Sequence, residues 1–347
     1  MRDLIEQQHF FMRYALSLGE KGRLMAPPNP WVGCVIVKNQ EIVGEGHTQS
    51  FGGAHAEAVA LEQAKGYAKG ATAYVTLEPC AHHGQTPPCT EALIKAGIKQ
   101  VVIPFKDPDP RVSGKGIAAL QAAGIDIIIG IAKDEAERSL RPYLFQRQTG
   151  RPYTILKLAS SLDGRTAAQD GSSKWITGEC ARRDVHLLRA TCQGIVVGSN
   201  TARLDKPRLT VRNIDQPHNQ PKRILIDICG KSPKEGADYD LIFTTNRHHP
   251  YKKAYILPKE SFIEEALTLL GKERIVSLLI EGGAATHVAF LPYAQQLTIY
   301  YGNCLLGSEG LASFPNLSIK TIKVAPRFTL EGVYRFDQDV RFDYKIS

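Results

Sequence analysis

Short apolar segments of strand length alternate with helix-patterned segments along two stretches of this 347-residue chain, which restricts the fold to the α/β class. The first stretch opens with a helix predicted over residues 4–18 and a Pro-rich break at 26–30. The order expected after the break is strand, strand, helix, strand, helix, strand, helix, strand. These segments are 31–37, 41–46, 54–64, 72–77, 90–96, 100–104, 116–123 and 125–130.

The second stretch begins after a charged, helix-patterned segment at 133–150. Gly150 and Arg151-Pro152 follow that segment, so we place a linker there and predict two domains, 1–150 and 151–347. A helix is expected at 181–190, and the tail from 311 to 347 is expected to supply an antiparallel strand pair. The other predicted strands are 153–159, 194–198, 223–227, 241–244, 275–280 and 297–301.

Composition narrows the class of partner. The formal net charge is +8, but no run of five or six basic residues occurs, so small phosphorylated ligands are favoured over nucleic acid. Seven cysteines are an odd number scattered along the chain, which is not typical of a disulfide framework. The charged N-terminal segment and the lack of a long apolar run predict a cytoplasmic enzyme with no membrane partner.

Three candidate metal ligands and one acid stand out in the first domain. They are His55 and Glu57, in the run His55-Ala56-Glu57, followed by Cys80 after a proline and by Cys89. One His and two Cys supply the three protein ligands of a catalytic zinc ion (Zn2+), with a fourth position open. Glu57 is close enough to move a proton between an attacking water and departing ammonia.

The spacing of the two cysteines separates this site from generic nucleobase deaminases. Eight residues, 81–88, lie between Cys80 and Cys89, whereas the short form of the motif has two. A structural zinc site is the alternative, because His82 or His83 can supply a fourth ligand. A lone cysteine is most often a small buried residue, which is the role we assign to Cys34, Cys180, Cys192, Cys229 and Cys304.

The second domain carries a different set of motifs. A buried strand at 275–280 ends in Glu281-Gly282-Gly283 before a helix begins, and such a turn can approach a pyrophosphate. Alone this signal is weak, because it lacks the Rossmann glycine spacing. Further motifs are Lys157–Arg165, Ser173–Thr177, Gly198–Thr201, Asp205 with Pro207, and Leu209–Arg212.

Together these motifs resemble the bifunctional deaminase/reductases of riboflavin biosynthesis. In the first domain the resemblance also includes Pro28–Pro30, Gly44–His47 and Asp107–Val112, and it covers 1–150 almost without a gap. In the second domain it spans about 153–305 and is thinner beyond. It implies a cytidine-deaminase-like α/β/α sandwich followed by a dihydrofolate-reductase-like α/β domain.

The resemblance also implies the roles of individual residues. In the deaminase it assigns substrate contacts to Asn29, His47 and Asp107. In the reductase, the residues implied to line NADPH are Ala159, Trp175, Thr201, Asp205, Gly282 and Gly283. Those implied to contact substrate are Ser173, Arg189, Leu209, Arg212 and Glu281, with both arginines suited to phosphate.

Three positions depart from the family pattern. The family often has a basic residue where Gln85 stands and a second His where Val59 stands, and both positions bear on substrate affinity. Lys206 stands between Asp205 and Pro207, where the family usually has a second Asp. A cation at this position bears on the preference for a cofactor, because it could bind the 2′-phosphate of NADPH.

The implied activity is hydrolytic deamination of 2,5-diamino-6-(5-phosphoribosylamino)pyrimidin-4-one, followed by NADPH-dependent reduction of its ribosyl group to ribityl. The implied partner is thus a small phosphorylated pyrimidine, with a homo-oligomer, most simply a dimer, expected. One alternative is a zinc-dependent nucleic-acid base deaminase with an accessory RNA-binding half, although no basic, aromatic-rich cluster supports it. Another is a non-enzymatic zinc-stabilised protein, against which Glu57 argues.

Overall fold

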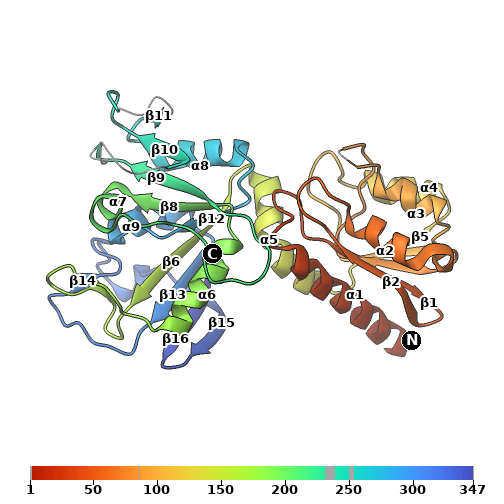
Figure 1. Ribbon diagram of the computed structural model, residues 1–347, viewed down its shortest axis with the longest axis horizontal. Helices are drawn as coiled ribbons and strands as arrows, with labels where there is room; N and C mark the ends of the chain where they lie inside the picture. Colours follow the sequence, from red (N-terminus) through yellow and green to blue (C-terminus); the bar gives the residue numbers. More distant parts are fainter. Residues whose placement is uncertain (1, 85, 231–238, 250–253, 347) are drawn as a thin grey trace. The chain divides into compact units, whose positions relative to one another are not determined.

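The computed structural model describes residues 2–84, 86–230, 239–249 and 254–346. The chain divides into two compact units, Met1–Gly150 and Arg151–Ser347, each with its own sheet (Figure 1). Strands and helices alternate in both units, so the predicted α/β class is confirmed. Within the described residues, every helix is too short or too polar to cross a bilayer.

The sheet of the first unit has five strands in the order β2-β1-β3-β4-β5. β1 is antiparallel to both β2 and β3, whereas β3, β4 and β5 run parallel. Each strand overlaps a segment predicted as a strand from the sequence. The bounds are β1 Gly33–Lys38, β2 Glu41–His47, β3 Thr72–Val75, β4 Gln100–Ile103 and β5 Asp126–Ile129.

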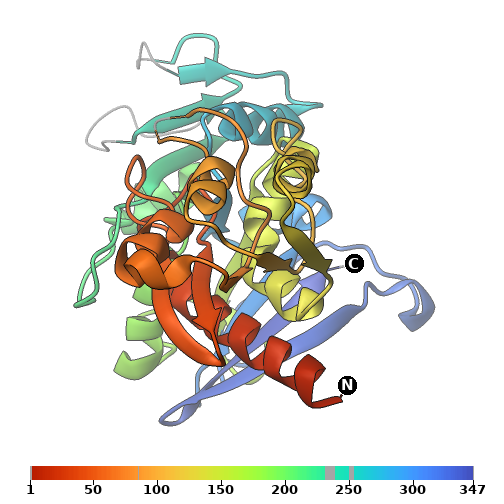
Figure 2. The ribbon, with the colours of Figure 1, turned by 90° about the vertical axis from the view of Figure 1, so that its right-hand side faces the viewer.

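Helices cover both faces of this sheet, which gives the predicted α/β/α sandwich (Figure 1, Figure 2). On one face, α1 and the start of α5 share a core with β1, β3 and β4. On the other, α2 packs so closely that a Cβ added at Gly44 would meet the Ala60 carbonyl at 2.2 Å. The bounds are α1 Arg2–Gly22, α2 Ala56–Ala64, η1 Lys65–Ala68, α3 Cys89–Lys95, α4 Lys115–Ala122 and α5 Lys133–Thr149.

The sheet of the second unit has nine strands in the order β11-β10-β9-β8-β12-β6-β13-β16-β15. The strands from β11 to β13 run parallel, and the C-terminal pair β15 and β16 is antiparallel, as expected for the tail. β7 (Arg165–Ala167) and β14 (Leu311–Ala312) form a separate ribbon. The nine strands are β6 Tyr153–Ser160, β8 Gly194–Gly198, β9 Lys222–Asp227, β10 Leu241–Thr244, β11 Ala254–Ile256, β12 Ser277–Ile280, β13 Gln296–Tyr301, β15 Phe328–Phe336 and β16 Asp339–Ile346.

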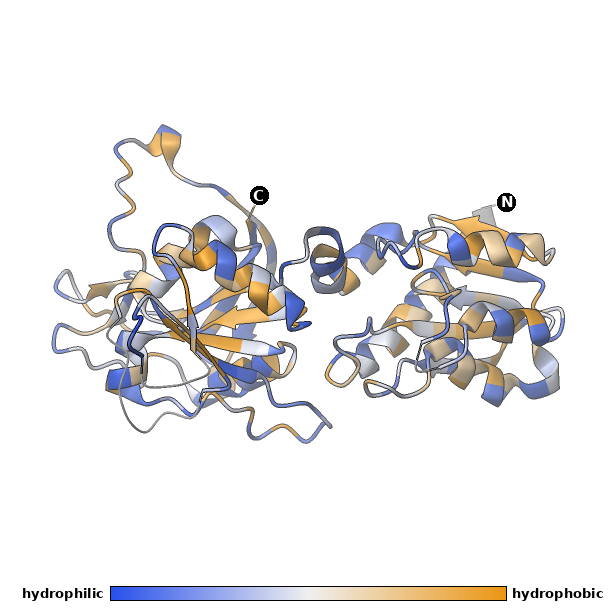
Figure 3. Cartoon of the chain, turned by 90° about the horizontal axis from the view of Figure 1, so that it is seen from above, coloured by the Kyte–Doolittle hydropathy of each residue, from blue (hydrophilic) through white to orange (hydrophobic). Residues whose placement is uncertain are grey.

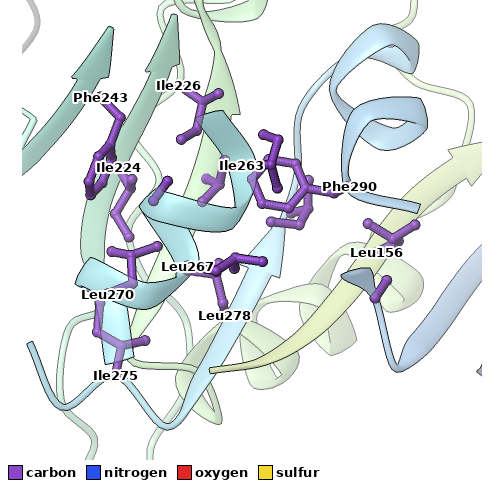
Figure 4. Packing of buried hydrophobic residues seen from close by; sticks show 14 of the residues in the cluster. Leu156, Ile224, Ile226, Phe243, Ile263, Leu267, Leu270, Ile275, Leu278 and Phe290 are labelled. Carbon is purple, nitrogen blue, oxygen red and sulfur yellow. The ribbon is translucent and has the colours of Figure 1, made fainter. Parts of the chain in front are cut away.

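Successive side chains of β6 point to opposite faces of the sheet, one of which carries the hydrophobic core. Leu156 and Leu158 of β6 face a hydrophobic core that includes Phe262 and Phe290 (Figure 4). Lys157 between them therefore points to the opposite face. Figure 3 shows the central strands of this unit as largely hydrophobic, whereas its helices carry both polar and apolar residues. The helices are α6 Glu179–Ala190, α7 Ser199–Asp205, α8 Phe262–Lys272, α9 Ala284–Phe290, η2 Leu291–Tyr293 and η3 Ile322–Val324.

Candidate active sites

Three metal-binding side chains meet at the N-termini of α2 and α3. His55 directly precedes α2, Cys89 is the first residue of α3, and Cys80 lies in the loop after β3. The Nδ1 atom of His55 lies 3.2 Å from Sγ of Cys89 and 3.6 Å from Sγ of Cys80. All three donor atoms lie within 4.8 Å of one another, so the predicted ligands do converge.

This donor set fits zinc. Tetrahedral zinc with Zn–N near 2.0 Å and Zn–S near 2.3 Å separates a nitrogen and a sulfur ligand by roughly 3.5 Å. The two nitrogen–sulfur distances lie on either side of that value. In the described part of the chain no further His, Cys, Asp or Glu joins the group, and His83 instead pairs with Glu91 at 3.3 Å. Three ligands leave the open position that catalysis needs.

Glu57 lies in the first turn of α2 and is only 4% exposed. Burial raises the pKa of its carboxyl, and negative charge on Cys80 acts in the same direction. The Cys89 thiol interacts with both groups and, by hydrogen bonding, holds the pKa of Cys80 well below its usual range. The acid and the three ligands thus form one contiguous cluster.

The predicted substrate residues of the deaminase gather at the same edge of the sheet. Because β1 is antiparallel to β2 and β3, and β3 is parallel to β4, the start of β1 and the ends of β2, β3 and β4 coincide. Asn29 precedes β1, His47 ends β2, Cys80 follows β3 and Asp107 follows β4. Residues distant in sequence are therefore brought to one side of the unit.

Two of these residues have shifted acidities. Asp107 is 4% exposed, and burial raises the pKa of its carboxyl to about 6. The Tyr143 hydroxyl donates to this carboxyl at 3.0 Å. Burial lowers the pKa of His47, and the positive charge of Lys21 lowers it further, so a neutral imidazole is favoured.

Glu78 is a buried residue that the sequence analysis did not single out. Its carboxylate accepts backbone N–H bonds from Asp107, Gly114 and Gly116 at 3.1, 2.9 and 2.9 Å, and from Ile117 at 3.2 Å. Because Glu78 stands two residues before Cys80, these bonds tie the metal-ligand loop to the Asp107 loop. The sequence signal for it was only an acid beside Pro79-Cys80.

Val59 and Gln85 are the two positions of this unit that depart from the family pattern. Val59 lies one helical turn after His55, to whose carbonyl its backbone N–H donates at 3.2 Å. Its effect on substrate affinity stays a prediction. Gln85 lies outside the described residues.

Predicted reductase residues also collect at one sheet edge. β6, β12 and β8 run parallel, so their carboxyl ends coincide. Ala159 lies near the end of β6, Thr201 and Asp205 lie in α7 directly after β8, and Glu281 follows β12. Ligands in open α/β sheets bind at this edge.

The Gly282-Gly283 turn joins β12 to α9 as expected. The backbone N–H of Gly283 donates to the Thr201 hydroxyl at 3.0 Å. A Cβ added at Gly282 would lie 2.6 Å from the Thr286 side chain, so glycine is required there by packing. The approach of a pyrophosphate to this turn stays a prediction.

Arg189 and Glu281 form a buried ion pair. Nε and Nη2 of Arg189 donate to the two carboxylate oxygens of Glu281 at 2.6 and 2.7 Å, and Nη1 donates to the Thr210 carbonyl at 3.1 Å. Three of the five guanidinium N–H groups therefore have protein partners. The phosphate contact expected of Arg189 stays a prediction. Lys157, whose charge also acts on Glu281, has its pKa lowered by burial.

The other predicted residues of this unit differ in exposure. Ser173 and Arg212 are exposed, and Trp175 is 69% exposed with the Arg182 guanidinium 4.5 Å from its ring centroid. Leu209 is buried at 2% exposure, and its contact with substrate stays a prediction. Lys206 is exposed at the C-terminal end of α7, and its link to cofactor preference stays a prediction.

Two family models divide the chain between them. The cytidine and deoxycytidylate deaminase zinc-binding region matches residues 5–104, and the RibD C-terminal domain matches residues 152–342. Since the second half matches a reductase family, the RNA-binding alternative is not favoured.

Similar proteins and structures extend over the whole chain. Riboflavin biosynthesis protein RibD of Chlamydia trachomatis is 44% identical, covering 93% of this chain and 91% of that protein, and RibD of Escherichia coli is 41% identical, covering 96% and 98%. The structure of Acinetobacter baumannii RibD has a TM-score of 0.90 at 39% identity and covers 99% of both chains. A Thermotoga maritima deaminase/reductase has a TM-score of 0.90 at 33% identity, again over 99% of both chains. The chain therefore belongs to the RibD family of bifunctional deaminase/reductases of riboflavin biosynthesis, with a zinc-binding deaminase domain and a reductase domain.

Proposed function

We propose that residues 1–150 deaminate 2,5-diamino-6-(5-phosphoribosylamino)pyrimidin-4-one and that residues 151–347 reduce the ribosyl group of the product to ribityl with NADPH. The Thermotoga maritima relative is named a diaminohydroxyphosphoribosylaminopyrimidine deaminase and 5-amino-6-(5-phosphoribosylamino)uracil reductase. The observation that carries the proposal is the convergence of His55, Cys80 and Cys89 beside the buried Glu57. Structural zinc requires no such acid.

Each side chain of the deaminase cluster has a defined task. His55, Cys80 and Cys89 hold zinc, which when bound polarises water for attack on the ring. Glu57 takes a proton from that water and delivers it to the amino group, which leaves as ammonia. One C–O bond forms, one C–N bond breaks, and the ring carbon becomes a carbonyl carbon.

Asn29, His47 and Asp107 bind and orient the pyrimidine. The Asn29 amide and a neutral His47 each offer both a donor and an acceptor to the ring edges. The Asp107 carboxylate accepts hydrogen bonds from amino groups of the substrate. Asn29 and Asp107 lie in loops and His47 ends β2, all at the sheet edge that carries the proposed zinc ligands.

The reductase residues bind NADPH, which supplies a hydride to C1′ of the ribosyl group. Burial, with the charges of Arg189 and Arg208, lowers the pKa of Arg212, so these cations lie near one another. Such a cluster suits the phosphate of the substrate. Ser173, Leu209 and Glu281 complete the proposed substrate site. The proposed cofactor residues are Ala159, Trp175, Thr201, Asp205, Gly282 and Gly283.

A reducing compartment suits this site, and we place the protein in the cytoplasm. The chain has seven cysteines, an odd number, and two of them are proposed zinc ligands whose thiolates an oxidising environment would threaten.

We also propose that two copies of the chain associate through β15, the outermost strand of the nine-stranded sheet among the described residues. β15 is the terminal strand and exposes Val333 and Leu330 by 54% and 50%. The connection before it, drawn in blue in Figure 2, extends away from the sheet and carries η3 (Ile322–Val324), whose Ile322 is 72% exposed. Exposed apolar edges of this kind pair with other chains. Light scattering should give the mass of a dimer for the parent protein and that of a monomer for Val333→Lys. The control Tyr67→Lys, which changes an exposed residue of the first unit, should stay dimeric.

The whole proposal is tested by product identification. Purified protein is incubated with the diaminopyrimidine substrate, with and without NADPH, and the products are identified by mass. Without NADPH we expect the deaminated ribosyl compound, and with NADPH its ribityl form. Base conversion within an RNA oligonucleotide, with the diaminopyrimidine unchanged, would contradict it.

A further inference from the structure

The helix that ends the first unit carries two side chains that reach both proposed substrate loops. We propose that Tyr143 and Arg147 of α5 are positioning residues that set the KM of deamination by holding the Asn29 and Asp107 loops in one arrangement. This inference rests on the proposed substrate contacts of those two loops. The matched zinc-binding region ends at residue 104, so α5 lies outside the part shared with cytidine and deoxycytidylate deaminases.

Tyr143 holds the Asp107 loop. Its side chain is 3% exposed, and its hydroxyl lies 3.0 Å from Oδ2 and 3.4 Å from Oδ1 of Asp107. A buried phenol whose only donor is directed at a carboxylate restricts the rotation of that carboxylate. Asp107 is thus presented in one orientation before substrate arrives.

Arg147 connects the two loops. Its Nη2 donates to the carbonyl of Pro28, next to Asn29, at 3.2 Å. Its Nε lies 3.4 Å from Oδ2 of Asp109, two residues after Asp107. A single planar guanidinium therefore spans segments that precede β1 and follow β4.

The two side chains act together because they are four residues apart on one helix. This spacing places them on the same face, and the Arg147 guanidinium lies 4.9 Å from the Tyr143 ring centroid. The charge of Arg147 also acts on Asp107 and Asp109, opposing the effect of burial on both carboxyls. A change at either position is therefore transmitted to substrate binding without touching the zinc ligands.

The test uses the full chain carrying Tyr143→Phe, Arg147→Gln or Arg147→Lys. The matched control is Arg138→Gln, which removes an exposed arginine from the same helix. We expect the KM of deamination to rise roughly tenfold for Tyr143→Phe and Arg147→Gln, as each loses a buried charge-assisted bond. The kcat, the zinc content and the reductase rate should stay within about twofold of the parent.

The pH dependence of the KM distinguishes the effect of the Arg147 charge from the effect of the shape of its guanidinium group. Asp107 faces Tyr143 and Arg147 of α5 and Asp109 of its own loop, the last paired with Arg111 at 2.6 Å. The positive charge of Arg147 lowers the pKa of Asp107. Its removal in Arg147→Gln should therefore raise this pKa and move the rise of KM at acid pH to higher pH. Arg147→Lys keeps the charge and should keep the parental pH dependence while KM still rises.

Unchanged KM in both Tyr143→Phe and Arg147→Gln would overturn the inference, as would loss of zinc or a fall in kcat alone. If Arg147→Gln does not fold, shown by a lost unfolding transition of the first unit, the variant Tyr143→Phe, which removes only one hydroxyl, decides. Failure of the parent to deaminate the diaminopyrimidine would instead reject the proposed function.

Discussion

The carboxyl of Asp107 has an acidity that substrate binding should report. Its pKa is raised by burial to about 6, so below this pH the group is protonated and loses its capacity as a charged acceptor. We predict that the KM of deamination falls as pH rises through about 6 and then levels. Asp107→Asn cannot ionise, so its KM should be high and flat between about pH 5 and 8. Steady-state kinetics with zinc content measured at each pH checks this, and a parental inflection in Asp107→Asn would contradict it.

Glu57 is the residue on which the chemistry of deamination depends most directly. Glu57→Gln preserves its size but cannot carry a proton, so we predict that kcat falls roughly 10²-fold or more. Zinc content should not change, because Glu57 is not among the converging ligands. Ammonia release and metal analysis measure the two effects. Glu62→Gln, an exposed change on the same helix, should behave as the parent, and an active Glu57→Gln would exclude the assigned role.

At the scale of elements, Glu78 joins two loops that the sheet alone leaves separate. Its carboxylate accepts four backbone N–H bonds, and a glutamine amide has too few acceptors to satisfy them. We predict that Glu78→Gln lowers the free energy of unfolding of the first unit by roughly 2 kcal/mol or more. Zinc should also bind more weakly, because Cys80 lies in the loop that Glu78 anchors.

Denaturant unfolding and competition with a chelator measure these two effects of Glu78→Gln. The matched control is Glu91→Gln, which removes an exposed carboxyl that pairs with His83. Exposed pairs contribute little to stability, so this control should change neither quantity by much. Equal stability of the two variants would show that the loop is held by other contacts.

At the scale of the whole molecule, each unit has its own core and its own set of proposed catalytic residues. We therefore predict that the activities can be removed separately. Glu57→Gln should oxidise NADPH normally when given deaminated substrate. Arg212→Ala should raise the KM of reduction roughly tenfold, through loss of a phosphate contact, while ammonia release continues. Loss of both activities from either change, in folded protein, would indicate one composite site.

The elements themselves were largely predictable from local pattern. Strand and helix segments were predicted in the right order because short apolar runs indicate buried strands and apolar residues near a period of 3.6 indicate helices. α8 was not predicted, although Phe262, Ile263, Ala266, Leu267 and Leu270 recur at helical spacing and are all buried. That signal was present in the sequence. β11 and α7 are too short to give a periodic pattern.

The α/β class, the three converging metal donors and the acid beside them could be predicted from the sequence, because each follows from residue types in a local pattern or motif. The pairing of Arg189 with Glu281 and the burial of Leu209 appear only in the folded chain. The same holds for the contacts of Glu78, Tyr143 and Arg147 with the loops around Asn29 and Asp107. These contacts join residues far apart in the chain. Their partners are set by which strand ends meet at a sheet edge, and local periodicity carries no information about that pairing.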